Sequence, residues 1–120
     1  MFDPSQSDDQ KKYIDVDSGL ARIRGNTAIY KKMLMLYLQS VEFDAFDEAL
    51  AEQNLSRASE IAHAIKGMTG NLSLPLLFGI STKLMGQLRE GELSQVDVAQ
   101  YHVILKETRH FVEKVLESLN

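Results

Sequence analysis

Apolar residues recur every three or four positions along most of the chain, a spacing typical of amphipathic helices. It is clearest between Thr27 and Gln53, where it runs to about Val41 and continues in register from Glu42. Three further stretches repeat it: Leu55 to about Ser73, Pro75 to about Arg89, and residue 94 to the C-terminus. Because only short links separate these long stretches, we predict an all-α fold, an antiparallel four-helix bundle.

Residues that commonly begin or end helices fall at the expected borders. Asn26 and Asn54 each precede a periodic stretch and can cap the helix that follows. Pro75 suits the first turn of a helix, and Gly91 interrupts the pattern of that helix at its far end. The S-x-x-D sequence at residues 94–97 is a capping-box pattern, which predicts the start of the last helix.

The N-terminal part is less regular than the rest. Residues 1–12 are polar and lack a period, so we predict a mobile tail and a folded domain over 13–120. Between Tyr13 and Arg24 a short apolar pattern predicts one or two helical turns, capped by Asp17 or Ser18. We expect these turns to pack across one end of the bundle.

The stretch from Ala58 to Leu72 separates into two faces when it is placed on a helix at about 100° per residue. The apolar face holds Ile61, Ile65, Met68 and Leu72, flanked by Ala58, Ala62 and Thr69. The other face carries His63 and Lys66, then Gly67 and Gly70, with Ser59 and Glu60 one turn earlier. We therefore expect the first face to lie in the core and the second to face outward.

Two glycines inside this predicted helix are unusual, because each costs about 1 kcal/mol relative to alanine. Gly67 and Gly70 both lie within about 40° of His63 around the helix, which clears the surface beside one imidazole. A histidine with an ordinary pKa of about 6.5 is largely a free-base nucleophile at neutral pH. Lys66, three residues on, can pair with an anion carried by that ring. The pattern predicts that something large approaches His63.

The same residues resemble a known family. Ala62-His63-Ala64-Ile65-Lys66-Gly67, continued by Gly70-Asn71-Leu72, resembles the A-H-x-L-K-G…G-N-I/L core of histidine-containing phosphotransfer (HPt) domains. The similarity covers about residues 15–118 and includes residues 19–23, Asn26, residues 83–84 and residues 88–91. The sequence departs from the family's pattern in two places. Residues 73–76 read S-L-P-L in place of a Gly/Ala-rich step, and Leu84-Met85 replaces a Leu-Glu pair.

The resemblance implies a helical bundle that works in a two-component phosphorelay. It implies that His63 accepts a phosphoryl group. The donor is either an aspartyl phosphate or a histidine kinase of the sensor or hybrid type. The group then passes to an aspartate of a response-regulator receiver domain, which also supplies the metal site. Lys66 would support the phosphoryl group, and Ser59, Glu60, Gly67 and Gly70 would lie where the partner docks.

Other interpretations of these residues remain open. The chain could be an HPt-like adaptor that binds a signalling partner without phosphorylation. Gly67 and Gly70 could instead let another helix of the same chain pack closely, and Gly79 and Gly86 carry the same ambiguity. Glu60 could orient the imidazole or be a surface charge. We interpret the remaining histidines, His102 and His110, as part of a solvated helix stripe.

Composition and charge exclude several classes of protein. The 120 residues suffice for one domain, and the absence of cysteine excludes disulfides and thiolate metal sites. With 13 Lys and Arg against 17 Asp and Glu the net charge is −4, which argues against nucleic acid as a partner. No carboxylate pair or H-E-x-x-H pattern indicates a metal, and no Walker loop indicates a nucleotide. We therefore expect no cofactor and no enzyme with its own ATP site, and the phosphoryl donor must be another protein.

The sequence also bears on where the chain works. It contains no apolar run of 18 residues, and Met1-Phe2-Asp3-Pro4 lacks the features of a signal peptide. We expect a cytoplasmic protein that does not insert into membranes. Because the apolar stripes are all used to form the bundle, we expect a monomer.

Overall fold

The computed structural model describes residues 7–119, and every regular element within this range is a helix. The elements are α1 (Asp8–Tyr13), α2 (Val16–Ala21), α3 (Thr27–Leu38), α4 (Glu42–Ala51), α5 (Leu55–Leu72), α6 (Pro75–Glu90) and α7 (Gln95–Ser118). The all-α prediction is therefore confirmed.

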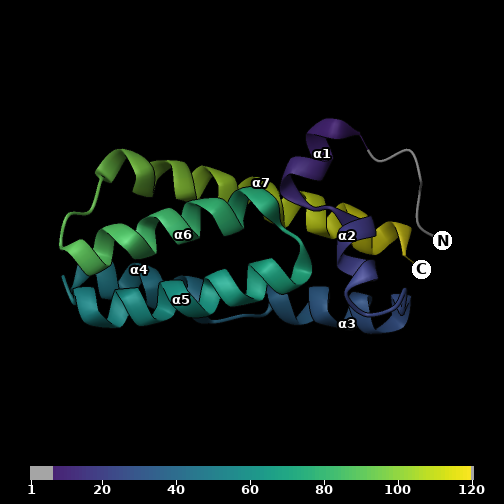
Figure 1. Cartoon of the computed structure of the whole chain (residues 1–120), viewed down its shortest axis with the longest axis horizontal. Coiled ribbons are helices and arrows are strands. Elements are labelled where there is room, and N and C mark those ends of the chain that lie inside the picture. Colours follow the sequence, from purple (N-terminus) through teal and green to yellow (C-terminus); the bar gives the residue numbers. More distant parts are fainter. Residues whose placement is uncertain (1–6, 120) are drawn as a thin grey trace.

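The long helices α5, α6 and α7 run along the longest axis of the molecule, and α3 and α4 follow one another beside them (Figure 1). Helix α5 packs against α6, α4 and α3, and α7 packs against α6 and α3. Helices α1 and α2 lie toward the end where α5 finishes (Figure 1). This arrangement buries one stripe of each long helix and leaves the opposite stripe outside.

The predicted caps explain where three of the long helices begin. The side-chain oxygen of Asn26 accepts from the backbone N–H of Ile29 at 3.0 Å. At the start of α5, the side-chain oxygen of Asn54 accepts from the backbone N–H of Arg57 at 3.1 Å. At the start of α7, the hydroxyl oxygen of Ser94 accepts from the backbone N–H of Asp97 at 3.2 Å. Pro75 occupies the first turn of α6, as predicted. Each cap satisfies a backbone N–H that has no partner within its own helix.

The N-terminal prediction was wrong in two respects. Residues 8–12 belong to α1, in which the Tyr13 ring stacks on Phe111 of α7 with centroids 5.0 Å apart. The rest of the predicted tail, residues 1–6, lies outside the described residues. Helix α2 is capped by Asp15 rather than by Asp17 or Ser18, because α2 begins at Val16 and both predicted caps lie inside it.

The first long helix ends before the predicted Val41. Helix α3 stops at Leu38, and a link over residues 39–41 leads into α4. Val41 is consequently 74% exposed, and Ile29 on α3 is 47% exposed, although both residues follow the apolar spacing of this stretch. Ile61 and Met68 of α5 are only partly buried against the core.

The core side chains hold the end of α5 in place. Tyr30 of α3 is fully buried, and its hydroxyl donates to the carbonyl of Leu72 at 2.8 Å. A Cβ at Gly19 would lie 2.5 Å from the Tyr30 ring, so α2 can pack here only because residue 19 is glycine. Helix α2 and the last turn of α5 are therefore fixed to the same tyrosine.

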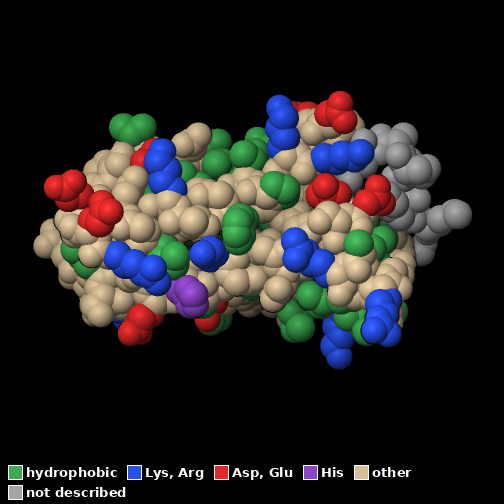
Figure 2. Space-filling model, in the orientation of Figure 1, with side chains coloured by type: hydrophobic (Ala, Val, Ile, Leu, Met, Phe, Trp, Pro, Cys, Tyr) green, Lys and Arg blue, Asp and Glu red, His purple; other side chains and the backbone are tan. Residues whose placement is uncertain are grey.

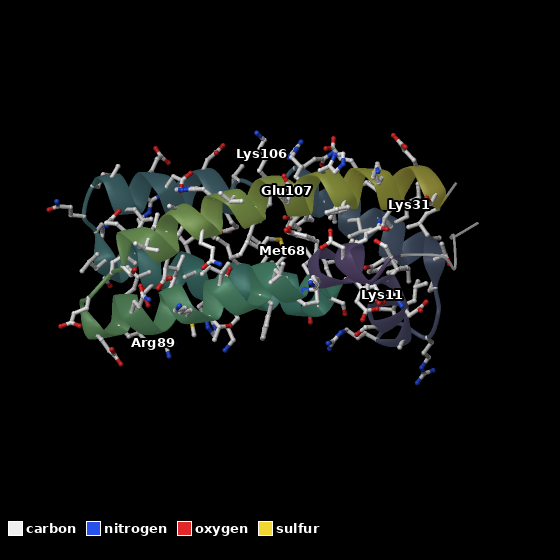
Figure 3. All side chains as sticks on the ribbon, turned by 90° about the horizontal axis from the view of Figure 1, so that it is seen from above. Lys11, Lys31, Met68, Arg89, Lys106 and Glu107 are labelled. Carbon is white, nitrogen blue, oxygen red and sulfur yellow. The ribbon has the colours of Figure 1, made fainter. Side chains whose placement is uncertain are left out.

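The charged side chains lie outside this core. Figure 3 shows Lys106 and Arg89 pointing outward on opposite sides of the molecule. None of the helices in the described range is both long enough and apolar enough to cross a membrane.

Candidate functional site

His63 lies near the middle of α5 and its side chain is exposed, as predicted. The neighbouring residues Ala62 and Ile65 are buried, so the packing of α5 fixes the direction in which His63 points. Within residues 7–119 the imidazole has no hydrogen-bond partner. The ring is therefore free to react with a group that arrives from outside.

The polar residues one turn earlier on α5 form no hydrogen bond with the imidazole in the part of the chain that the structure describes. Ser59 is half-buried and Glu60 is exposed. No hydrogen bond joins Glu60 to His63 in the part of the chain that the structure describes. Glu60 therefore does not orient the ring in this state, and it adds one negative charge to the surface.

The two glycines beyond His63 differ in their surroundings. A Cβ at Gly70 would lie 3.1 Å from the ring of Phe78, so packing of α6 accounts for this glycine. A Cβ at Gly67 would meet nothing within 4 Å. The same is true of Gly79 and Gly86 on α6. Within the described range, no contact explains the cost of glycine at position 67.

Lys66 is half-buried and follows His63 by one turn of α5. Its Nζ lies 6.0 Å from the centre of the Phe78 ring, at the outer limit of a cation–π contact. No carboxylate within residues 7–119 forms an ion pair with it. The ammonium of Lys66 is therefore available to a negatively charged group near His63.

His63, Lys66 and Gly67 lie at the edge of a surface depression of about 500 Å³. Its other sides are formed by the start of α6, with Pro75 and Phe78, and by α2. Figure 2 shows the face formed by α5 and α6, where Lys and Arg side chains alternate with hydrophobic ones and a histidine lies among them. An open depression of this kind suits the approach of a large partner.

Sequence reasoning missed the part of the depression that α2 contributes. Asp15, Ser18 and Arg22 line it together with Ser73, which follows α5 in a left-handed conformation with φ of 58°. Ser73 Oγ donates to Ser18 Oγ at 3.0 Å, and Arg22 Nε donates to Ser73 Oγ at 3.2 Å. Asp15, Ser18 and Arg22 are spaced three and four residues apart, which puts them on one helix face. That spacing does not reveal the partner, which lies more than 50 residues away.

We compared the chain with known protein families, curated proteins and solved structures, and found no match. The function must therefore be argued from the site.

The other two histidines are occupied elsewhere. His102 Nε2 lies 2.8 Å from Asp47 Oδ1 and joins α7 to α4, and the His110 ring packs edge-on against Phe111. Neither lines the depression beside His63. Among residues 7–119 no group of three or more His, Asp or Glu side chains is arranged to hold a metal ion.

The exposed ring makes nucleophilic chemistry available at His63. An exposed imidazole is a nucleophile, and the ammonium of Lys66 can neutralise an anionic group carried on it. The glycines of the chain sit singly, mostly within helices, so they form no phosphate-cradling loop. The site therefore offers an exposed nucleophile with a cation one turn away on the same helix.

Proposed function

We propose that this protein is a histidine phosphotransfer protein of a two-component phosphorelay. The observation that carries the proposal is the empty space at Gly67 beside the exposed His63. A glycine in a helix interior lowers stability, and no contact within the described residues requires it here. Close approach of a second protein to the imidazole explains the glycine and the exposed nucleophile together.

The proposed fold is an antiparallel four-helix bundle with short N-terminal helices across one end. Helices α3 and α4 together form one side of the bundle, and α5, α6 and α7 form the other three. The course of the long helices along one axis supports this description (Figure 1). It is also the fold that the resemblance of residues 62–72 to HPt domains implies.

In the proposed reaction, a ring nitrogen of neutral His63, Nε2 in the family, attacks the phosphorus of an aspartyl phosphate in line. The N–P bond forms while the P–O bond to the aspartate breaks, and the electron pair of that bond leaves with the carboxylate. The other ring nitrogen keeps its proton, and the ring carries a positive charge until solvent removes that proton. Transfer onward repeats these steps in reverse with a second aspartate.

Lys66 supports the phosphoryl group by offsetting its negative charge. The receiver domain supplies the aspartate and its own metal site, so this chain needs neither a cofactor nor a nucleotide site and is not an enzyme in its own right. A sensor or hybrid histidine kinase starts the relay. We place the relay in the cytoplasm and propose that the protein acts as a monomer.

The docking surface in this proposal surrounds His63. Gly67 lets the partner's main chain come close, and Ser59 and Glu60 lie one turn away on α5. Gly70 contributes indirectly, because its missing side chain makes room for Phe78. A transient complex of this kind needs only a modest interface.

An HPt-like adaptor that binds a partner without phosphorylation is the second candidate. The depression beside His63 supports this candidate as well, because a protein can bind in it without any reaction at the histidine. An adaptor does not need a nucleophile, so replacement of His63 by glutamine would leave its function intact. The relay loses all transfer with the same replacement.

The deciding experiment follows labelled phosphate from phosphorylated receiver domains to the wild type, to His63→Gln and to the matched control His110→Gln. We expect acid-labile, alkali-stable label on the wild type and on His110→Gln, and none on His63→Gln, with equal circular dichroism for all three. Label that persists on His63→Gln, or a folded wild type that no donor labels, would contradict the proposal.

A further inference from the structure

Arg22 is the second cation of the depression, and it comes from the N-terminal part of the chain. It follows the last residue of α2 and its side chain is exposed. Only its Nε is engaged, by the hydroxyl of Ser73. No carboxylate within residues 7–119 lies within 4.0 Å of it, so both terminal nitrogens can donate to a group from outside.

The serine that binds the Arg22 guanidinium is itself fixed by several hydrogen bonds. Ser73 Oγ also bonds Ser18 Oγ, and the backbone N–H of Asp15 donates to the carbonyl of Ser73 at 2.9 Å. The Tyr30 hydroxyl fixes the preceding carbonyl, that of Leu72. A pre-positioned arginine loses less entropy on binding than a free surface arginine does.

Arg22 is hydrogen-bonded at Ser73, well beyond His63 along α5. Ten residues separate His63 from Ser73, which corresponds to roughly 15 Å at 1.5 Å per residue. Lys66 lies only one turn from the imidazole and can reach a phosphoryl group on it. Of the two cations of the depression, Lys66 is therefore the one that lies next to His63 on α5.

We propose that Arg22 is a docking residue that binds a carboxylate on the surface of the receiver domain seated over His63. This inference rests on the proposed phosphotransfer function. The depression is lined by two positive charges, Arg22 and Lys66, and by one negative charge, that of Asp15. Its local charge is therefore positive, although the whole chain carries a net charge of −4. Asp15 is itself engaged, since it accepts from the N–H of Ser18. The depression therefore favours an acidic partner surface.

Arg22 thereby contributes to the choice of partner rather than to the chemistry. Its planar fork can bind a carboxylate through two parallel hydrogen bonds, which fixes orientation as well as charge. A receiver domain that lacks a carboxylate at this distance from its reactive aspartate would bind less well. α2 would therefore distinguish among receiver domains that share the same reaction centre.

The test measures transfer from phosphorylated protein to a receiver domain over a range of receiver concentrations. The variants are Arg22→Gln and the matched control Arg24→Gln, which removes an exposed arginine two residues away that does not line the depression. For Arg22→Gln we expect the receiver concentration at half-maximal rate to rise about fivefold, with the maximal rate unchanged. Arg24→Gln should match the wild type.

The outcomes separate the two proposals. If the wild type transfers phosphate and Arg22→Gln transfers it with the same concentration dependence, the docking role is wrong and the relay stands. A lower maximal rate for Arg22→Gln would also overturn the role, because it would place Arg22 at the phosphoryl group. If the wild type takes up no phosphate from any donor, the relay fails and the docking role fails with it. Amide variants of receiver carboxylates, combined with Arg22→Gln in double-mutant cycles, then identify the partner residue.

Discussion

The hydroxyl of Tyr30 donates a 2.8 Å hydrogen bond to the backbone carbonyl of Leu72, 42 residues away. The bond lies in the core and ties α3 to the last turn of α5. Ser73, which follows directly, binds Arg22. One buried bond therefore supports the far end of the depression beside His63.

Tyr30→Phe should lower the free energy of unfolding by about 1 to 2 kcal/mol, because it leaves the buried Leu72 carbonyl without this partner. Tyr37→Phe is the matched control, since the Tyr37 hydroxyl is buried without a partner in the described range. Removal of the Tyr37 hydroxyl should leave the free energy of unfolding unchanged or raise it. Urea unfolding curves of both variants provide the measurement. Equal losses for the two variants would show that the Tyr30 bond is not the cause.

Gly67→Ala should raise the free energy of unfolding by about 1 kcal/mol, because alanine favours the helix and its methyl group meets nothing. In the proposed relay it should slow phosphotransfer about tenfold, since the methyl group lies where the partner approaches. Gly79→Ala should give the same gain in stability with normal transfer. Transfer by Gly67→Ala at the wild-type rate would remove the argument for close approach at this position.

Asp97 should make stability depend on pH in acid. Hydrogen bonds from Gln87 at 2.7 Å and from Lys83 at 3.2 Å hold the pKa of its carboxyl below the usual value. A lowered pKa in the folded state stabilises the protein above the unfolded pKa of about 4, and this contribution disappears as the pH falls through the folded value. Asp97→Asn should therefore lose less stability than the wild type on acidification.

Urea midpoints of the wild type and Asp97→Asn across a pH series test this prediction. Asp17→Asn is the control, because Asp17 is exposed and accepts no side-chain hydrogen bond in the described range. Parallel curves for Asp97→Asn and the wild type would mean that the links from α6 to Asp97 contribute nothing.

Three tyrosines should make the protein sensitive to alkali. Burial raises the pKa of Tyr30, Tyr37 and Tyr101 well above the ordinary value near 10. Because the raised pKa exists only in the folded state, stability is full below about pH 10 and falls as the pH rises further. Tyrosinate absorbance from these residues should appear together with loss of helical circular dichroism. Ionisation of all tyrosines in a protein that remains folded would contradict the burial.

The sequence predicted most of the helices because their signals are local. Apolar spacing and the caps Asn26, Asn54 and Ser94 act within a few residues, and the structure has each of them in its predicted role. The early end of α3 was missed because apolar spacing continues across the link over residues 39–41. Helix α1 was missed because its polar residues carry no period, and its attachment comes from packing against α6 and α7, including the stack of Tyr13 on Phe111.

The candidate site was predictable only along α5. His63, Lys66 and Gly67 face outward as their positions on one helix require, and Gly67 and Gly70 look alike in sequence. Only the structure separates them, because Phe78 comes from another helix. The side of the depression that α2 contributes depends on contacts between Ser73 and residues more than 50 positions earlier. No spacing in a single sequence indicates such contacts.

His63 stands on an 18-residue helix that is packed against its neighbours along its length. Packing of this kind holds the helix that carries the exposed ring. In the proposed relay, then, the loaded and unloaded proteins have the same shape and differ in charge at a single point. The proposed relay would then carry its message as a chemical state rather than a conformational one, and the direction of flow would follow the supply of phosphorylated and free receivers.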